Sequence, residues 1–588
     1  MKLSVPSPRG LAVCVAVVLA IFIFAQSTPP AQVTQHENAA LTDAVGIQPK
    51  SGGKIVLGAT RYCDSFDPAR SYDQWCGVIF RLYSRNLMAF QGQPGKASMA
   101  TVPDAAAVVP TVSTDKTTWT FTLRSNVRWS DGKPITASDV KYSIQRLFDP
   151  KIIGAVNVSY LCLLTSCPKG VPQYPGPYVR SKIKLASVSI SGTRTVRFKL
   201  KAPFVDFDRV LALPQFSIVQ RDRELALLKR KQTYADNPSS SGPFVITRDK
   251  ETRSVKFVRN KNWNQQSDPI RNPRVDTFLW RNYRNDILLD RAVLNGDIDI
   301  RLGDGLGKEG LETLAKNQTL LKNVDNPYTG YVNYFALSKH IAPMNRIRCR
   351  EAIFYAVDKS ALQNLRGGDR GSSVATSLLP TLLDGYSEMN NRYPSGKDNS
   401  GNISAARESL KQCGYPDGFE FSIAYLNAGI GPEIVRSVQT SLARIGVVVV
   451  PKPFNTYAKF VAVVQNPDEL TTSDISMVIS GNSSPISSAY DYWAPIADSR
   501  LISAFGNQNL ALINSQSIDN TIDQLISSPE QRTDLSAKIN DDVMATAQYL
   551  PYAYDKQVLY RSPHLANVYV QQALGGHYDL VNMALATK

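Results

Sequence analysis

The sequence predicts an α/β protein built from two or three lobes. Its 588 residues are several times the length of one domain, which is about 100–200 residues. Segments with strand-like alternation and segments with helical spacing follow one another along the chain, as in lobes with mixed sheets. Hydrophobic residues make up 43% and charged residues 20% of the chain, an ordinary composition for a globular protein.

The N-terminus has the layout of a secretory signal. Lys2 and Arg9 precede an apolar run at 11–25, and small or polar residues follow at 26–30 (QSTPP). A helix over that run would be about 22 Å long, short of the roughly 30 Å hydrocarbon core. We therefore predict that 1–27 is a signal peptide or a signal anchor. The chain would be exported, to the cell surface or the periplasmic space, and associated with the outer face of the cytoplasmic membrane.

The segment 28–52 contains few large hydrophobic residues and is rich in Pro, Gln, Ala and Thr. This composition is typical of a flexible tether. The folded body is expected to begin with a short strand at 53–58 (GKIVLG).

The cysteines indicate disulfides. Cys14 lies in the apolar run, and an even number remains in a chain that we expect to be exported. The remaining cysteines are Cys63, Cys76, Cys162, Cys167, Cys349 and Cys413. Six cysteines allow fifteen pairings; we favour the local pairs Cys63–Cys76 and Cys162–Cys167, which leave Cys349–Cys413. Zinc is disfavoured because the spacings contain no Cys-x-x-Cys pair, and no metal or cofactor is predicted.

Residues 119–150 read as strand, hairpin turn and helix. Positions 119–124 (WTFTLR) alternate between apolar and polar, and 129–134 (WSDGKP) supply the residues of a tight turn. Positions 136–139 (TASD) resemble a capping box, and Asp149-Pro150 ends the helix.

The same alternation continues to the end of the chain. We predict strand pairs at 185–190 with 195–200 and at 241–246 with 254–259. A helix end at 290–297 precedes a strand at 298–300, and helices are expected at 348–358 and 437–445. An apolar strand follows at 446–450.

The residues of catalysis are scarce. The chain has four histidines, none with metal-ligand spacing, and it lacks the common hydrolase motifs. Ser138 and Lys141 match S-x-x-K, but the composition of a helix start already accounts for Ser138. The loop 367–371 (GGDRG) lacks the ending of a phosphate-binding loop. No catalytic residue is predicted, and the chain is not expected to be an enzyme.

The formal charge of +16 comes from scattered basic residues. Nucleic-acid binding requires basic residues gathered along one track, so no nucleic-acid partner is predicted. A basic surface facing an anionic membrane or wall is the simpler interpretation.

Several blocks, in order, resemble the signature of the family 5 extracellular solute-binding proteins of the peptide, dipeptide and nickel type. The resemblance covers about 53–588, and the cysteine pattern is similar to that of actinobacterial members. The blocks are 121–124 (FTLR), 129–140 (WSDGKPITASDV), 241–244 (SGPF) with 259–260 (RN), 294–299 (LNGDID), 349–359 (CREAIFYAVDK) and 413–419 (CGYPDGF).

The resemblance implies a two-lobe, periplasmic-binding-protein-like fold (type II, Venus flytrap) with an extra subdomain inserted in the first lobe. Two chain crossings near 325–328 and 549–551 would form the hinge. The implied boundaries are 53–85, 186–326 and 551–588 for lobe I, 86–185 for the inserted subdomain, and 327–550 for lobe II.

The resemblance also implies a function. The chain would be the extracytoplasmic substrate-binding subunit of an ABC importer. It would act as a monomer, capture peptides or a peptide-like solute between its lobes, and deliver them to the transmembrane permease subunits at the membrane surface. The alternative is an exported receptor or sensor of the same fold that is not coupled to import.

The sequence departs from the family where the ligand is expected. Many peptide-binding relatives carry a Trp and then an Asp after a strand, and that Asp pairs with the peptide amino terminus. Here the strand 474–479 is followed by 480–485 (SGNSSP), so recognition of a free amino terminus stays open. Asp491 would replace that Asp if its loop folded back. Core packing is the alternative for each aromatic candidate, and turn formation for Asp73 and Asn482. The candidate cleft residues are Tyr72, Asp73, Trp75, Asn333, Tyr334, Asn482, Tyr490 and Asp491.

Overall fold

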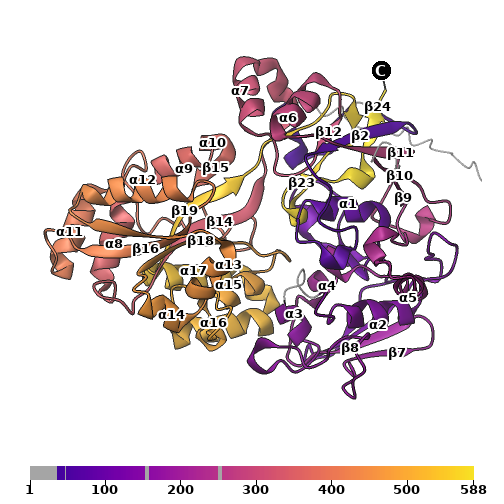
Figure 1. Cartoon of the computed structure of the whole chain (residues 1–588), viewed down its shortest axis with the longest axis horizontal. Coiled ribbons are helices and arrows are strands. Elements are labelled where there is room, and N and C mark those ends of the chain that lie inside the picture. Colours follow the sequence, from indigo (N-terminus) through magenta and orange to yellow (C-terminus); the bar gives the residue numbers. More distant parts are fainter. Residues whose placement is uncertain (1–35, 47, 153–157, 249–253, 588) are drawn as a thin grey trace, which may run out of the picture. The chain divides into compact units, whose positions relative to one another are not determined.

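A computed structural model describes residues 36–46, 48–152, 158–248 and 254–587 (Figure 1). The predicted signal segment and the first part of the predicted tether lie outside these residues. Within the described residues, no helix is long and apolar enough to cross a membrane.

The first lobe (36–326 and 557–587) is built around a five-stranded sheet in the order β12-β2-β11-β10-β9. Strand β2 is parallel to β11 and β12, whereas β10 is antiparallel to both of its neighbours. Its buried positions alternate, with Ile55 and Leu57 of β2 beside Phe278 and Trp280 of β11. Its elements are β2 (Lys54–Ala59), α1 (Cys76–Tyr83), β9 (Phe244–Arg248), β10 (Val255–Arg259), β11 (Thr277–Asn282), α6 (Asp286–Asn295), β12 (Ile300–Arg301) and α7 (Lys308–Lys316).

The inserted subdomain of this lobe contains a four-stranded antiparallel sheet, β5-β6-β8-β7. The expected boundary at residue 185 divides this sheet, because β6 pairs with β8, which begins at Thr195. Thr136 and Asp139 form the capping box that opens α2, so the start of this helix is confirmed. The elements are β5 (Thr111–Val112), β6 (Thr118–Thr122), α2 (Ala137–Arg146), α3 (Val158–Cys162), β7 (Val188–Ser191), β8 (Thr195–Lys199), α4 (Phe207–Val210) and α5 (Arg221–Lys229).

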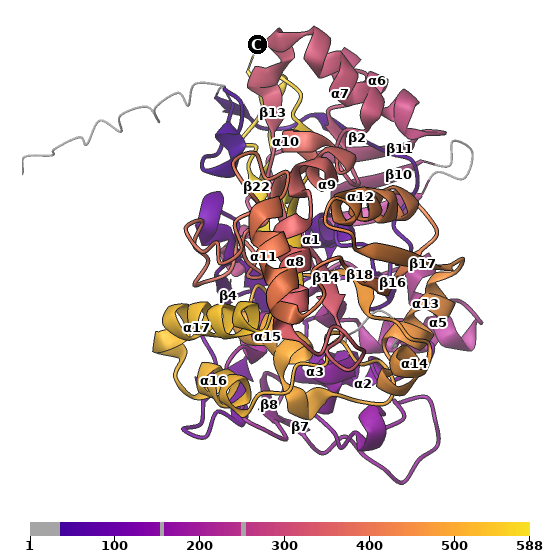
Figure 2. The same ribbon diagram turned by 90° about the vertical axis from the view of Figure 1, so that its left-hand side faces the viewer.

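The second lobe (327–556) has a six-stranded sheet in the order β15-β19-β14-β18-β16-β17. Helices α8 and α11 pack together, and α12 packs along β16 and β17 (Figure 2). The strands are β14 (Tyr328–Leu337), β15 (Ser372–Val374), β16 (Glu420–Leu426), β17 (Val448–Phe454), β18 (Met477–Asn482) and β19 (Tyr549–Lys556). The helices are α8 (Ile347–Ala356), α9 (Lys359–Leu365), α10 (Gly368–Gly371), α11 (Ile403–Cys413), α12 (Gly431–Ala443), α13 (Tyr457–Val464), α14 (Pro467–Thr472), α15 (Ala489–Ala497), α16 (Gln516–Ser527) and α17 (Arg532–Ala545).

The chain passes between the lobes twice, along paired strands (Figure 1). β13 (Val324–Asp325) pairs with β20 (Leu559–Tyr560), and β14 pairs with β19 just beyond them. The second crossing therefore follows Lys556 and not the expected 549–551, because β19 continues through the sheet of the second lobe. Short strands complete the first lobe: β1 (Pro49–Lys50), β3 (Met88–Phe90), β4 (Thr101–Pro103), β21 (Leu565–Ala566), β22 (Val570–Gln571), β23 (His577–Tyr578) and β24 (Ala584–Ala586).

The described part of the expected tether is folded, so the prediction of a flexible segment is wrong for 36–46 and 48–52. Ala39 and Ala40 are fully buried, and β1 pairs with β24. The Ala40 amide donates 3.0 Å to the Asp325 carboxylate beside the hinge. Composition misled here for two reasons. Two small residues, Ala39 and Ala40, fill the available space, and β24, the strand that pairs with β1, lies more than 500 residues away along the chain.

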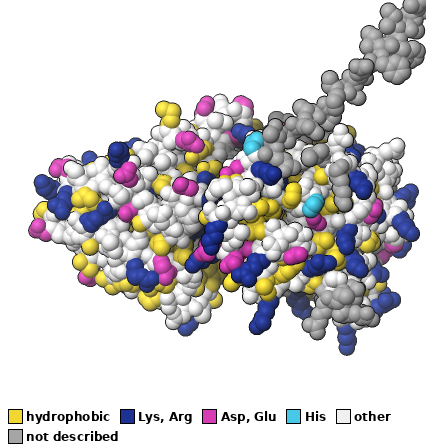
Figure 3. Space-filling view, turned by 90° about the horizontal axis from the view of Figure 1, so that it is seen from above, with side chains coloured by type: hydrophobic (Ala, Val, Ile, Leu, Met, Phe, Trp, Pro, Cys, Tyr) yellow, Lys and Arg dark blue, Asp and Glu magenta, His cyan; other side chains and the backbone are white. Residues whose placement is uncertain are grey.

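Three disulfides link the six cysteines, in the pairing that the sequence analysis favours. They are Cys63–Cys76, Cys162–Cys167 and Cys349–Cys413, and the last one joins α8 to α11. Figure 3 shows Lys and Arg side chains dispersed over one face among Asp and Glu, without a single basic stripe on that face.

Candidate ligand-binding cavity

A cavity of about 230 Å³ lies between the two lobes. The first lobe contributes 72–74, Phe80 of α1, 213–216 and 572–575, and its inserted subdomain contributes Tyr160. The second lobe contributes 329–330, 380, 382–383, 483–485 and 487. The walls are largely apolar, with hydroxyl and amide groups between the apolar side chains, as is usual for a small-molecule site.

Tyr72 and Asp73, two of the predicted residues, line this cavity. Asp64 holds their loop in place, since its carboxylate accepts a hydrogen bond of 2.8 Å from the Tyr72 amide and one of 2.5 Å from the Ser71 hydroxyl. Asp73 pairs with Arg61, with 2.8 Å between Oδ1 and Nη2. The hydrogen bond to Asp73 raises the pKa of the Arg61 guanidinium.

Three other predicted residues lie inside the protein, away from the cavity wall. Trp75 is 6% exposed and packs edge-on against Trp280, with ring centroids 5.7 Å apart. Tyr334 packs against Tyr549 inside the second lobe. Asn333 is buried, and its side-chain amide donates a hydrogen bond of 2.8 Å to Asp555. For Trp75 and Tyr334 the packing alternative describes the observed environment.

Asn482 and Tyr490 are near the cavity but are not among the residues that line it. The Asn482 amide donates to the Tyr492 carbonyl at 3.5 Å. Tyr490 packs edge-on against Phe204 of the first lobe, with ring centroids 5.6 Å apart. Tyr490 thus contacts the opposite lobe and does not line the cavity.

Asp491 is held by two groups of the cavity wall. Its Oδ1 accepts a hydrogen bond of 2.6 Å from the Tyr160 hydroxyl, and its Oδ2 accepts one of 2.8 Å from the Ser484 hydroxyl. Burial raises the pKa of the Asp491 carboxyl to about 6, since removal from water disfavours the charged form. Asp491 therefore supports the wall from behind and links the inserted subdomain to the second lobe.

A second group of interlobe contacts lies next to Asp491. Asp206 of the first lobe accepts a hydrogen bond of 2.6 Å from the Ser488 hydroxyl, and its carboxylate lies 2.8 Å from the Arg532 guanidinium. Arg209 donates 3.2 Å to the Ile486 carbonyl. Both lobes are therefore joined by charge-assisted hydrogen bonds at this edge of the cavity.

The loop after β18 reaches the cavity, and Gly481 near the end of β18 lets Tyr331 approach the strand closely. A Cβ atom placed on Gly481 would lie 2.2 Å from the Tyr331 ring, closer than atoms pack. Ser483, Ser484 and Pro485 of this loop line the cavity. The loop in which the sequence departs from the expected Trp and Asp is therefore at the site, and it presents hydroxyls and a proline.

The sequence analysis missed several polar residues of the wall: Gln74, Tyr160, Gln215, Thr329, Ser483, Ser484, Ser487 and Gln572. The serines follow the strand that the family comparison singled out, so their position could have identified them. Tyr160 and Gln572 are more than 400 residues apart, and no local pattern connects them.

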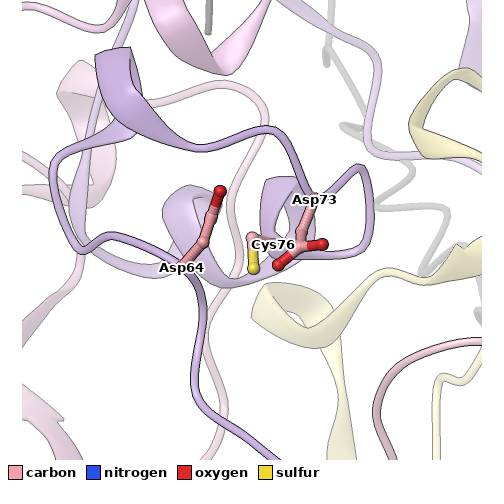
Figure 4. A group of neighbouring side chains, drawn as sticks. All are labelled: Asp64, Asp73 and Cys76. Carbon is pink, nitrogen blue, oxygen red and sulfur yellow. The ribbon is translucent and has the colours of Figure 1, made fainter. Parts of the chain in front are cut away.

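Asp64, Asp73 and Cys76 have ligand atoms within 4.8 Å of one another, close enough for a metal ion (Figure 4). The chemistry of the donors does not fit a metal. The Cys76 sulfur is bonded to Cys63, whereas a metal-binding cysteine supplies a thiolate. Both carboxylates already have hydrogen-bond partners.

The chain matches a family model described as bacterial extracellular solute-binding proteins, family 5 Middle, over residues 100–502, which is more than half of its length. It is 23% identical to the glutathione-binding protein GsiB of Salmonella typhimurium, covering 92% of this chain and 96% of that protein. It is 25% identical to the oligopeptide-binding protein OppA of Bacillus subtilis, covering 62% of each.

Solved structures with the same fold include the clavulanic acid biosynthesis oligopeptide binding protein 2. That structure is 31% identical, with a TM-score of 0.85 over 94% of this chain and 99% of that one. DppA of Helicobacter pylori, solved in complex with the peptide STSA, is 20% identical with a TM-score of 0.64 over 92% and 99%. The chain therefore belongs to the family 5 bacterial extracellular solute-binding proteins, which are binding proteins and not enzymes.

Proposed function

We propose that this chain is the extracytoplasmic substrate-binding subunit of an ABC importer, and that it captures peptides or a peptide-like solute between its lobes. The observation that carries the proposal is the cavity at the lobe junction, with walls from both lobes and paired strands at the hinge. The names of relatives and structural neighbours add support, since they include a glutathione-binding protein, an oligopeptide-binding protein and a protein solved with a bound peptide.

The mechanism follows from the two-sided wall. A solute in the cavity contacts both lobes only when they are close together, so it stabilises the closed arrangement by its difference in affinity for the two states. Hinge closure of this kind moves two rigid bodies about a few residues, here the segments around β13 and β20. The closed form would then dock on the permease subunits at the membrane surface, as a monomer.

The wall suits a ligand with a polar backbone and apolar side chains. Hydroxyl and amide groups of Thr329, Ser483 and Gln215 can exchange hydrogen bonds with peptide groups, while Phe80 and Leu574 contact apolar parts. Peptide groups buried without such partners would cost roughly 2–7 kcal/mol each.

The experiment that tests the proposal is mass spectrometry of ligand released from protein purified from its native host. We expect a set of peptide masses, and the same peptides should be taken up by vesicles that contain the permease. Peptide release without permease-dependent uptake would favour the receptor alternative. A non-peptide ligand, together with no binding of test peptides, would overturn the peptide part of the proposal.

A further inference from the structure

We infer that the cavity accepts ligands that are uncharged or positively charged at the wall, with Asp73 as the counter-charge, and rejects ligands that place a carboxylate inside. This inference rests on the proposed function and specifies the class of solute.

The charge of the wall is one-sided. Among the described residues that line the cavity, Asp73 is the one carboxylate, and there is no Lys, Arg or His. A ligand carboxylate would therefore lose its water without gaining a cationic partner. Burying an unpaired charge is far more costly than burying a hydrogen-bonded neutral group.

The corner that contains Asp73 is acidic even though Arg61 is present. Asp73, Asp304 and Asp64 all act on the Arg61 guanidinium, so three carboxylates face one cation. The Arg61 side chain is 56% exposed and that of Asp73 is 20% exposed. The pair is bidentate, from Arg61 Nη1 to Oδ2 and from Nη2 to Oδ1, and each carboxylate oxygen can accept a further hydrogen bond, so a ligand cation can join Asp73 while Arg61 stays in place.

A second, independent observation concerns hydrogen-bond donors. Gln572 lines the cavity, and its side-chain Oε1 is buried without a hydrogen-bond partner in the described structure. A buried acceptor of this kind requires a donor. If the Gln572 side chain turns so that this enclosed atom faces the cavity, a ligand ammonium, guanidinium or amide N–H would supply the donor, whereas a carboxylate brings only acceptors.

The apolar part of the wall sets the rest of the ligand class. Phe80, Leu213, Phe216, Leu382 and Leu574 line the cavity, so an apolar group beside the cation would be buried favourably. Glutathione carries two carboxylates. The inference therefore separates this chain from the glutathione-binding relative, with which it shares 23% identity.

The test uses four forms of one tripeptide, Ala-Phe-Ala, measured by calorimetry on the full chain at pH 6.5, which is below the usual pKa of a peptide amino terminus. The amide with a free amino terminus carries one positive charge, and the acetylated amide is neutral. The free peptide has both charges, and the acetylated acid is negative. We expect the cationic form to bind at least tenfold more tightly than the negative form, with the neutral form between them.

Asp73→Asn should bring the cationic and neutral forms to within about twofold of each other. Asp222→Asn is the matched control, because Asp222 is exposed on α5 and outside the cavity; it should leave the order unchanged. Tighter binding of the negative form, or an unchanged ratio of cationic to neutral affinity in Asp73→Asn, would overturn the inference.

The failure of the two proposals can be distinguished. If no tripeptide form binds, the net charge of ligand released from the native protein decides. A cationic or neutral non-peptide would remove the peptide proposal and keep the inference, and an anionic one would overturn both. Protein that releases no ligand and binds none of the four forms would also count against both.

Discussion

The Tyr160 hydroxyl donates a hydrogen bond of 2.6 Å to Oδ1 of Asp491 and thereby joins α3 of the inserted subdomain to α15 of the second lobe. Tyr160 also lines the cavity, so the same side chain contacts the ligand space and the opposite lobe. One side chain therefore belongs both to the cavity wall and to the contact between the lobes.

Tyr160→Phe removes this link while keeping the ring. A hydrogen bond to a charged group contributes about 1.5–3 kcal/mol, so we expect affinity for the amidated Ala-Phe-Ala probe to fall about tenfold to a hundredfold. Tyr178→Phe is the control, since it removes a hydroxyl that pairs with Tyr142 in the same subdomain at 2.9 Å. Equal affinities of the two variants in calorimetry would contradict the link.

Stability should fall as pH rises through the titration of Asp491. Burial raises its pKa from 3.8 to about 6, so between these values the native state binds more protons than the unfolded state. The contribution is thus fully present below about pH 4 and lost above about pH 6. Urea unfolding of Asp491→Asn between pH 4.5 and 7 should lack this component.

Asp236→Asn offers a comparison of opposite sign for the same measurement. Hydrogen bonds from the Thr233 backbone and side chain lower the pKa of Asp236, so its stabilising contribution is lost as pH falls. If both variants shifted the pH profile in the same direction, the assignment to Asp491 would be wrong.

Because of Lys359, we expect the opposite trend at higher pH, where stability should rise with pH. It is 4% exposed, its ammonium donates 2.8 Å to the Ala375 carbonyl, and burial lowers its pKa to about 7. Between pH 7 and about 10 the unfolded state holds the proton that the native state has lost, so stability rises with pH. Unfolding at pH 7, 8 and 9 should show a steeper rise for the native sequence than for Lys359→Met, and parallel profiles would refute this.

The disulfides should differ in their contributions. Cys349 and Cys413 are separated by 64 residues, whereas Cys162 and Cys167 are separated by 5. In the chain-entropy model, these loops stabilise by about 4 and about 2 kcal/mol. Paired Cys→Ser variants, compared by urea unfolding, should follow that order, and a larger loss for the short loop would contradict it.

Local signals in the sequence predicted the fold well. The capping box of Thr136 and Asp139, the alternation in β6 and the family blocks depend on neighbouring residues, so they can be read without a structure. The site depends on distant segments. Alternation along β14 shows that Asn333 and Tyr334 lie on opposite faces of a strand, but it does not show that the second lobe buries both.

The N-terminal segment has a practical consequence for producing the protein. A recombinant chain that starts at Gly53, the first residue of the predicted body, would lack β1. Strand β24 would still pair with β21 but would become an edge strand, which is a site for self-association. The shortened chain would also lose the hydrogen bond that the Ala40 amide donates to Asp325 beside the hinge. Expression should therefore begin before His36, so that the pairing of β1 with β24 and the contact of Ala40 with Asp325 are both kept.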